Sequence, residues 1–322
     1  MRRTSRAFWI TDCQRGELRN TPLHAATDQS VLVTTHYSGI SRGTERLVFE
    51  GRIPESERER MRAPFQAGEF PWPVKYGYSA VGRAETGPLA GQMVFCLHPH
   101  QDCFLVPEDA ITPLPAGLPP ARAVLAANME TALNGVWDAA PRIGDRITII
   151  GAGVVGLLVA SLCKGIVGTD VEVIDPAASR TTTLSRLGLD HRLSAEEASR
   201  ERDVIIHASG HPKGLETALT LAGQEGRIIE MSWYGSTTVP LMLGQTFHSR
   251  RLTLRSSQVG TIAPDQQPRW NYRRRLEKAM ALLCDERFDT LINGESPFEH
   301  LPEHYADIVK NPDTLCHRVS YC

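Results

Sequence analysis

The sequence predicts an α/β protein in two parts, a β-rich module over residues 1–123 and a doubly wound parallel-sheet domain over residues 124–258. Short apolar runs broken by turn residues dominate the first part. From Asp145 onward, strands alternate with helices, and a glycine-rich turn joins the first of these strands to an apolar helix. This alternation calls for parallel strands joined by right-handed crossovers.

Composition sets limits on the function. A chain of 322 residues is long enough for two domains, and 35 basic against 37 acidic residues leave a formal charge of -2. Such a charge provides no general attraction for nucleic acid or for an anionic membrane, so neither is expected as a partner. Seven cysteines without a Cys-x-x-Cys pair favour a reducing compartment. Because the apolar run Ala7–Ile10 is too short for a signal peptide, we expect a cytoplasmic protein.

Period-two apolar patterns predict strands in the first part, at Ala7–Ile10, Ser30–Thr35, Ser79–Gly82, Met93–Phe95 and Cys103–Val106. The charged segment Glu50–Gly68 is expected to be a surface excursion with one or two helical turns. Prolines then punctuate the chain before a helical pattern over Ala121–Trp137.

In the second part, β-branched runs predict strands at Ile147–Ile150, Val171–Ile174, Val204–His207, Gly226–Met231 and Leu252–Ser256. Helices are predicted over Val154–Lys164, Ser179–Leu187 and Gly214–Ala222. A further helix from Trp270 to Leu283 precedes a short strand at His317–Tyr321.

The turn Gly151-Ala152-Gly153-Val154-Val155-Gly156 lies directly between a predicted strand and a predicted helix. In such a turn, the glycines permit a tight bend, a close approach of the backbone to a pyrophosphate, and close packing of helix on strand. Unpaired N–H groups at the helix N-terminus would face the phosphates. The turn therefore predicts a dinucleotide site, against the alternative of a turn kept for packing alone.

Asp175 ends the second predicted strand, 24 residues after Gly151. A carboxylate at this place accepts hydrogen bonds from an adenosine ribose and repels a 2′-phosphate, so it favours NAD. Arg180 lies five residues further on and could instead meet that phosphate, which keeps NADP as the alternative.

The order of the motifs resembles the medium-chain dehydrogenase/reductase family, the alcohol dehydrogenase-like proteins, over essentially the whole chain. The matching segments are Tyr37–Glu45, Lys75–Gly82, the Gly151 turn, Asp203–Gly210, Gly226–Met231 and Leu252–Gln258. The resemblance implies a GroES-like catalytic domain over 1–123, completed by 259–322, and a Rossmann NAD(P)-binding domain over 124–258, with the active site in the cleft. The stretch around Ser41 looks most like the bacteriochlorophyllide hydroxyethyl dehydrogenases. Homodimers or tetramers are usual in the family, and we expect a homodimer.

The chain departs from the family at the positions of the catalytic zinc ligands. Ser41 stands where zinc-dependent members have a cysteine, and Tyr78 and Ser79 replace a His-Glu pair. Glu130 is left as the one plausible donor, and neutral hydroxyls are poor zinc ligands beside thiolate and imidazole. We therefore expect no catalytic zinc. Ser41, Thr44 and Tyr78 become the candidate hydrogen-bond donors to substrate, with Glu130 as an orienting group or base.

The segment Cys96–Cys103 holds two histidines, two cysteines and an aspartate within eight residues. Its spacing matches no common zinc motif, so it is open to three interpretations: a metal site, a polar lining of the substrate cleft, or an ordinary loop. His98 and His100 are candidate acid–base groups because a neutral imidazole titrates near the working pH.

The remaining candidates concern the cofactor. Arg42 matches a family position that often contacts the pyrophosphate, and Ser209 with Gly210 is expected to pass under a ribose. Ser232 and Trp233 follow the next strand at the edge where ligands bind, with core packing as the alternative for Trp233.

The leading hypothesis is a zinc-independent NAD(P)-dependent oxidoreductase that acts on a small carbonyl, alcohol or activated alkene. A second hypothesis is a metal-dependent secondary alcohol dehydrogenase that uses Glu130 with His98 or His100. A third is a nucleotide-binding protein without catalysis.

Overall fold

The computed structural model describes residues 4–23 and 29–321, and the chain forms two compact units. Unit 1 comprises Met1–Ala127 with Leu276–Cys322, and unit 2 comprises Asn128–Arg275. The chain passes between the units within the helices α3 (Ala126–Ala139) and α7 (Tyr272–Leu282). The second boundary thus falls later than the predicted residue 258. Residues 259–275 pack in unit 2, where the side chain of Arg275 donates a hydrogen bond to the carbonyl oxygen of Val259.

Unit 1 contains the helices α1 (Arg42–Phe49), α2 (Pro120–Ala123) and α8 (Leu301–Lys310). Its strands are β1 (Thr4–Asp12), β2 (Arg15–Pro22), β3 (Ser30–Ser41), β4 (Ala67–Gly68), β5 (Val74–Lys75), β6 (Ala80–Ala84), β7 (Met93–Cys96), β8 (Cys103–Pro107), β9 (Ile111–Pro113), β16 (Ile292–Pro297) and β17 (Cys316–Ser320).

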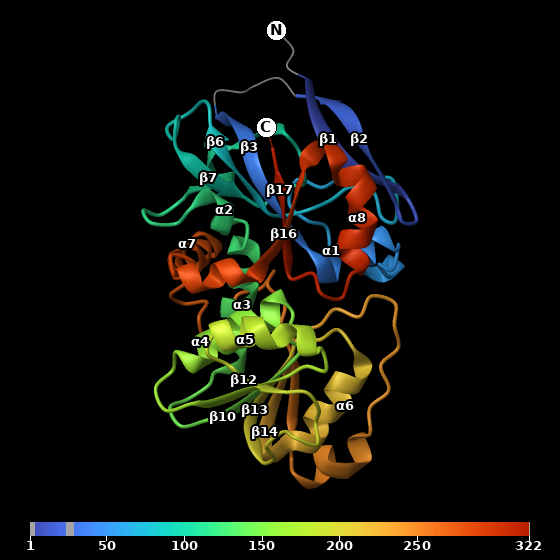
Figure 1. Cartoon of the computed structure of the whole chain (residues 1–322), viewed down its shortest axis with the longest axis vertical. Helices are drawn as coiled ribbons and strands as arrows, with labels where there is room; N and C mark the ends of the chain where they lie inside the picture. Colours follow the sequence, from blue (N-terminus) through green and yellow to red (C-terminus); the bar gives the residue numbers. More distant parts are fainter. Residues whose placement is uncertain (1–3, 24–28, 322) are drawn as a thin grey trace. The chain divides into compact units, whose positions relative to one another are not determined.

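Two sheets form unit 1, with strand orders β2-β1-β5-β4 and β16-β17-β3-β6-β7-β9, and β8 also pairs with β3. In Figure 1 the C-terminal elements β16, β17 and α8, coloured red, lie beside the N-terminal strands of this unit, coloured blue. Strand β17 pairs antiparallel with β3, with Cys316 opposite Ser41. The last segment therefore completes unit 1. A cluster of buried side chains that includes Val31, Val94 and Phe104 forms one core of this unit.

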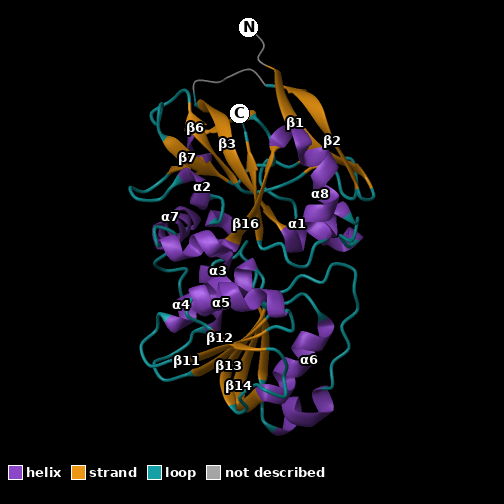
Figure 2. Ribbon diagram, viewed as in Figure 1, coloured by secondary structure: helices purple, strands orange, loops and turns teal. Residues whose placement is uncertain are grey.

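Unit 2 contains α4 (Val154–Lys164), α5 (Thr181–Arg186) and α6 (Pro212–Leu221). Its strands are β10 (Arg146–Ile150), β11 (Asp170–Ile174), β12 (Asp190–Arg192), β13 (Arg202–His207), β14 (Ala222–Glu230) and β15 (Thr253–Ser256). They pair in the order β12-β11-β10-β13-β14-β15, and every neighbouring pair is parallel. Figure 2 shows α4 and α5 together and α6 apart from them across the strands. This order is that of a doubly wound dinucleotide-binding fold, and the predicted fold class is confirmed.

The predicted helix over Ala121–Trp137 is wrong in one respect, because the structure divides it into α2 and α3. At the break, the carbonyl oxygen of Val124 accepts a hydrogen bond from the Ser79 hydroxyl at 2.6 Å, which takes the place of a bond within a continuous helix. The pattern also missed β16 and α8, which precede the predicted C-terminal strand. Among the described residues, no helix has both the length and the apolar character needed to span a bilayer.

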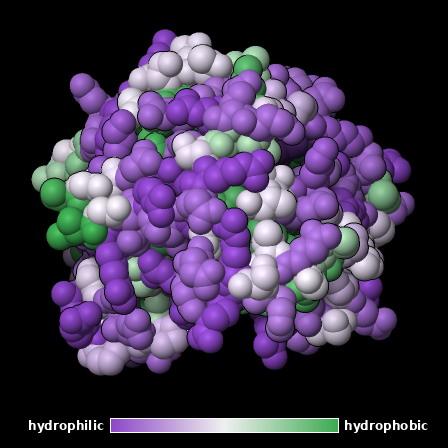
Figure 3. Space-filling view, turned by 90° about the horizontal axis from the view of Figure 1, so that it is seen from below, coloured by the Kyte–Doolittle hydropathy of each residue, from purple (hydrophilic) through white to green (hydrophobic). Residues whose placement is uncertain are grey.

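The face of the molecule in Figure 3 carries mainly hydrophilic side chains, with hydrophobic residues in small groups. Among the large apolar side chains that reach the surface of the described chain, Ile143 and Val167 are the most exposed, at 78% and 77%. Both lie in the loops that flank α4 and β10 in the sequence, so neither takes part in the core of unit 2.

Candidate functional site in two parts

Three hydroxyl groups meet in unit 1 where β3 gives way to α1. Ser41 is the last residue of β3 and the N-cap of α1, Thr44 lies in the first turn of that helix, and Tyr78 lies between β5 and β6. Burial and the nearby Glu45 carboxylate raise the pKa of the Tyr78 hydroxyl, whereas its hydrogen bonds with the Ser41 and Thr44 side chains act in the opposite direction. Tyr78 therefore stays protonated at neutral pH and can donate a hydrogen bond.

A fully buried carboxylate lies beneath these hydroxyls. Glu45 accepts hydrogen bonds from the backbone N–H of Ser41 at 2.8 Å and from the Tyr305 hydroxyl at 2.8 Å. Its Oε2 atom is also 3.0 Å from His100 Nε2, and both side chains are essentially inaccessible to solvent. Buried carboxylates are costly unless their hydrogen bonds are satisfied, and three partners meet this need.

The network continues from His100 to two further hydroxyls. The Ser38 hydroxyl is 2.7 Å from His100 Nδ1 and 2.9 Å from the Tyr321 hydroxyl. Burial raises the pKa of Tyr321 and of Tyr305, so both stay protonated. Because the Glu45 carboxylate can only accept, His100 Nε2 carries the proton on that side when the imidazole is neutral, and Nδ1 then accepts from Ser38.

His98 has different surroundings from His100. Its ring stacks on Phe104 at a centroid distance of 3.7 Å, and its Nδ1 is 2.9 Å from the carbonyl oxygen of Pro99. Burial lowers the pKa of His98 to about 3, which keeps the ring neutral at physiological pH. The loop thus brings His100, and not His98, to the Glu45 carboxylate.

The residues at the family's zinc positions do not fit a zinc ion. Ser41 and Tyr78 offer neutral hydroxyls, and the pKa of Tyr78 is raised, so a phenolate ligand is disfavoured. Over the residues that the structure describes, His, Cys, Asp and Glu side chains form no group of three or more suited to a metal. Glu130, the remaining candidate ligand, is engaged in unit 2 by Arg275, whose Nε is 3.0 Å from Glu130 Oε1.

The pairing of Glu130 with Arg275 has a structural explanation. Arg275 is buried, donates to Asn134 Oδ1 at 2.7 Å and thereby joins α7 to α3. Burial raises the pKa of Glu130 while the Arg275 charge opposes that change. Breaking such a buried pair by removing one partner leaves an uncompensated charge.

In unit 2, the glycine turn has the geometry of a phosphate cradle. Gly151 has φ of +108°, and a Cβ there would lie 2.7 Å from the backbone of Ser209. A Cβ on Gly156 would lie 1.9 Å from the carbonyl oxygen of Gly151, whereas the space in front of Gly153 is open. Gly153 is the N-cap of α4 and provides no side-chain cap to the amides that follow, which begin with Val154 and Val155. These features fit a dinucleotide pyrophosphate.

Asp175 lies next to this turn. Its Oδ2 accepts the N–H of Ala152 at 2.7 Å, and its Oδ1 accepts the N–H of Ala177 at 2.9 Å. Each oxygen keeps a second lone pair with which a ribose hydroxyl could bond. Arg180 ends a short 3-10 turn after β11 and is buried.

The other cofactor candidates also take definite places. Gly210 donates its N–H to the Ser232 hydroxyl at 3.0 Å, which links the segments after β13 and β14. Trp233 is half-buried after β14, and Arg42 is half-buried at the start of α1 in unit 1. Arg42 thus belongs to unit 1, whereas the other cofactor candidates belong to unit 2.

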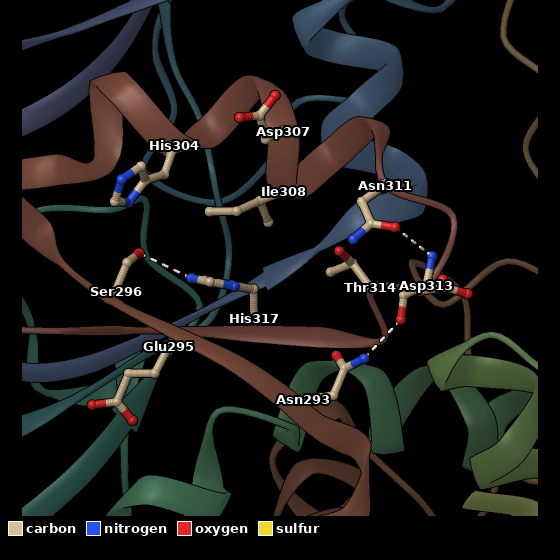
Figure 4. Close-up of a pocket in the computed structure, with 10 residues that line it drawn as sticks. All are labelled: Asn293, Glu295, Ser296, His304, Asp307, Ile308, Asn311, Asp313, Thr314 and His317. Carbon is tan, nitrogen blue, oxygen red and sulfur yellow. Dashed lines mark hydrogen bonds between the residues drawn. The ribbon is translucent and has the colours of Figure 1, made fainter. Parts of the chain in front are cut away.

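A polar cavity of about 490 Å³ lies in unit 1, outside the predicted site. It lies under the connection from β16 through α8 to β17 and is lined by Asn293, Glu295, Ser296, His304, Asp307, Ile308, Asn311, Asp313, Thr314 and His317. Figure 4 shows His317 pointing toward Ser296, to which its Nε2 is 2.9 Å distant. Asn293 is likewise engaged, with the backbone of Asp313 and Leu315. Side chains that line the cavity thus hydrogen-bond within the β16–α8–β17 connection itself.

Comparison with known proteins supports the fold and the family. No family model matches the chain. A D-guloside 3-dehydrogenase of Escherichia coli K12 is 26% identical over 197 residues, which are 56% of this chain and 55% of the relative. The chain thus spans about half the length of the first curated relatives that it matches. A 2-desacetyl-2-hydroxyethyl bacteriochlorophyllide A dehydrogenase of Cereibacter sphaeroides is 25% identical and covers 92% of each chain.

Among solved structures, a protein described as a zinc-binding dehydrogenase, from Sinorhizobium meliloti 1021 and bound to NADP, superposes with a TM-score of 0.77. It is 17% identical, and the match covers 99% of both chains, which shows a shared fold. The chain thus shares the two-domain fold of these dehydrogenases, with a GroES-like and a Rossmann domain. In sequence the chain is similar to dehydrogenases of the alcohol dehydrogenase-like type, which agrees with the resemblance of its motifs.

Sequence reasoning did not single out Glu45, Ser38, Tyr305 or Tyr321. Glu45 lies four residues after the N-cap Ser41, one position beyond the glutamate of a capping box, and an acidic residue so near a helix start was the one local signal for it. Tyr305 and Tyr321 are brought to the site by long-range packing, for which the local sequence carries no pattern.

Proposed function

We propose that this chain is an NAD(P)-linked oxidoreductase that transfers hydride between a nicotinamide and a small carbonyl, alcohol or activated alkene without a catalytic zinc ion. The observation that carries the proposal is the hydroxyl cluster formed by Ser41 and Tyr78, at the family's zinc positions, with the adjoining Thr44, close to the buried Glu45. The cradle formed by Gly151, Gly153 and Gly156 in unit 2 is the observation that supports nucleotide binding.

A bound nicotinamide supplies or accepts the hydride. Hydride addition to a carbonyl places negative charge on its oxygen, and a preorganised donor stabilises this charge most where water is excluded. Tyr78 is such a donor because its raised pKa keeps the hydroxyl protonated. Ser41 and Thr44 orient that hydroxyl, and the proton of Tyr78 can pass to the product oxygen. A protonated tyrosine favours carbonyl reduction over alcohol oxidation, which would need a base.

Glu45 and His100 act in this scheme as positioning residues. Glu45 binds the backbone N–H of Ser41 and thus holds the β3 to α1 junction that carries two of the three hydroxyls. Its negative charge also helps to keep Tyr78 protonated. His100 satisfies the second carboxylate oxygen and ties Glu45 to β3 through Ser38.

Asp175 supports NAD as the cofactor, with NADP as the alternative through Arg180. Six cysteines are free thiols among the described residues, as expected in a reducing compartment, and we include a cytoplasmic location in the proposal. A homodimer is included as well, with the edge strand β15 as the contact, since an exposed edge can pair with a second copy.

The test uses the purified full chain, stripped of metal and analysed for residual zinc. We expect NADH or NADPH to bind, and a panel of ketones, aldehydes and enones to reveal turnover that does not rise when zinc is added. Turnover that depends on added zinc would favour the metal-dependent alternative. Tight nucleotide binding with no turnover on any panel member would favour the non-catalytic one.

A further inference from the structure

A second carboxylate–imidazole pair lies in unit 2, at the carboxyl edge of the parallel sheet. His207 and Glu230 are the last residues of β13 and β14 and stand opposite one another in register. His207 Nδ1 is 2.7 Å from Glu230 Oε2, and His207 Nε2 is 2.6 Å from the Ser209 hydroxyl. The imidazole is fully buried, whereas Ser209 is exposed. A Ser–His–Glu chain thus runs from the sheet to the surface.

The hydrogen bonds fix the direction of the protons. The Glu230 carboxylate accepts the N–H of Ser232 at 2.6 Å and the Tyr234 hydroxyl at 2.8 Å, and it has no proton to give. In neutral His207 the proton is therefore on Nδ1, and Nε2 must accept from Ser209. The Ser209 oxygen also accepts the N–H of His211 at 3.1 Å. The hydrogen of the Ser209 hydroxyl thus points toward His207, and the second lone pair of its oxygen remains for a ligand.

Neighbouring glycines leave room for this arrangement. A Cβ on Gly214, in the first turn of α6, would lie 2.4 Å from His207 Nε2 and 2.8 Å from the Ser209 oxygen. On the other side, a Cβ on Gly151 would lie 2.7 Å from the backbone of Ser209. The hydroxyl is therefore held next to the first glycine of the phosphate cradle.

We propose that Ser209, held by His207 and Glu230, is a hydrogen-bond acceptor that reads a ribose hydroxyl of the bound dinucleotide. The inference rests on the proposed function, since it takes the nucleotide at the Gly151 turn as given. A ribose hydroxyl can donate to the outward lone pair. A phosphate oxygen at the same place cannot donate, so a nucleotide phosphorylated at that hydroxyl is disfavoured.

The test is calorimetric titration of the full chain with NADH. Ser209→Ala is expected to weaken binding about tenfold, the value of one good hydrogen bond. The control is Ser56→Ala, an exposed serine of unit 1, which should leave the affinity unchanged. Analogues of NADH that lack one ribose hydroxyl at a time identify the partner. For one of them, the wild type and Ser209→Ala should bind equally.

Glu230→Gln tests the proton direction. The amide can donate to His207 Nδ1, which would put the imidazole proton on Nε2 and turn the Ser209 hydrogen outward. We expect weaker NADH binding in this variant and no further loss when Ser209→Ala is added. Circular dichroism and thermal melts establish that each variant is folded.

Two failures can be told apart. If the wild type binds no nicotinamide nucleotide, the proposed function fails and this inference fails with it. If the wild type binds NADH and Ser209→Ala binds within twofold of it, or if its loss is the same for every deoxy analogue, the proposed function survives and the role of Ser209 is wrong.

Discussion

Each unit of the molecule contains a glutamate–histidine pair, and the two pairs differ in where their hydrogen bonds end. In unit 1, Glu45 and His100 are both buried, and their partners are the buried hydroxyls of Tyr305 and Ser38. In unit 2, Glu230 is 12% exposed, and the chain of hydrogen bonds through His207 ends on exposed Ser209. A glutamate–histidine pair stabilises the fold when its hydrogen bonds end on buried hydroxyls. It can position a group for a ligand when the chain of hydrogen bonds ends on an exposed hydroxyl.

The largest expected effect separates the two pairs by stability. Glu45→Ala leaves His100, Tyr305 and the Ser41 amide without their acceptor. Each buried donor left unsatisfied costs about 1–3 kcal/mol, so the expected loss of unfolding free energy is at least about 3 kcal/mol. Glu230→Ala lies at the partly exposed edge and should cost about 1–2 kcal/mol. Urea denaturation of both variants measures the difference. Equal losses would mean that burial does not distinguish the pairs.

Next comes the hydroxyl beside the first pair. Tyr78→Phe removes the proposed donor to the substrate oxygen, and loss of such a donor lowers kcat by about 10²–10³. Steady-state kinetics with the best carbonyl substrate measure it. The matched control is Tyr272→Phe, whose hydroxyl donates to the Gly260 carbonyl oxygen on the surface of unit 2. If Tyr78→Phe keeps the wild-type kcat, Tyr78 is not the donor.

Unit 1 also buries Lys75 with a neutral partner, since its Nζ donates to Gln101 Oε1 at 2.7 Å. Burial lowers the pKa of Lys75 to about 8 from 10.5. The unfolded state therefore holds more protons between these two pH values, and stability rises with pH across that window. Lys75→Met should stabilise the protein by about 2–3 kcal/mol at pH 7, and the gain should shrink above pH 10. Denaturation at both pH values tests this, and a gain that is independent of pH would contradict it.

A smaller effect is expected in acid. Burial lowers the pKa of His98 to about 3 and that of His317 to about 4, both from 6.5. The unfolded chain takes up these protons first, so stability is lost as the pH falls below 6.5 toward those values. His98→Phe, which keeps the stack on Phe104, should flatten the decline of the urea midpoint between pH 7 and pH 4.5. An unchanged slope would remove His98 from the explanation.

Much of unit 2 could be predicted because its strands, helices and glycine turn follow from patterns of residues that are close together in the sequence. The alternation of strands and helices gave α4 with its observed bounds, and the spacing of Gly151, Gly153 and Gly156 gave the cradle. Less of the candidate site in unit 1 could be predicted from the sequence. The hydroxyls of Ser41, Thr44 and Tyr78 were expected together, but the buried acceptor beneath them depends on Tyr305, which is 260 residues from Glu45 in the sequence.

The surroundings of His98 and Glu130 show the same limit. A histidine in a polar loop and a lone glutamate on a helix are both plausible acid–base groups in a sequence. In the structure Phe104 stacks on His98 and Arg275 pairs with Glu130, and their acid–base roles stay predictions. Each partner is more than five residues away in the sequence from the residue that it contacts, so no local spacing predicts these contacts.

The most direct test of zinc-free hydride transfer follows the hydrogen itself. Metal-stripped protein would be incubated with a carbonyl substrate and NADH or NADPH that carries deuterium at C4, and the product analysed by mass spectrometry and NMR. We predict deuterium on the former carbonyl carbon with the wild type and a greatly reduced yield with Tyr78→Phe. Deuterium transfer that occurs only after zinc is restored would contradict the account.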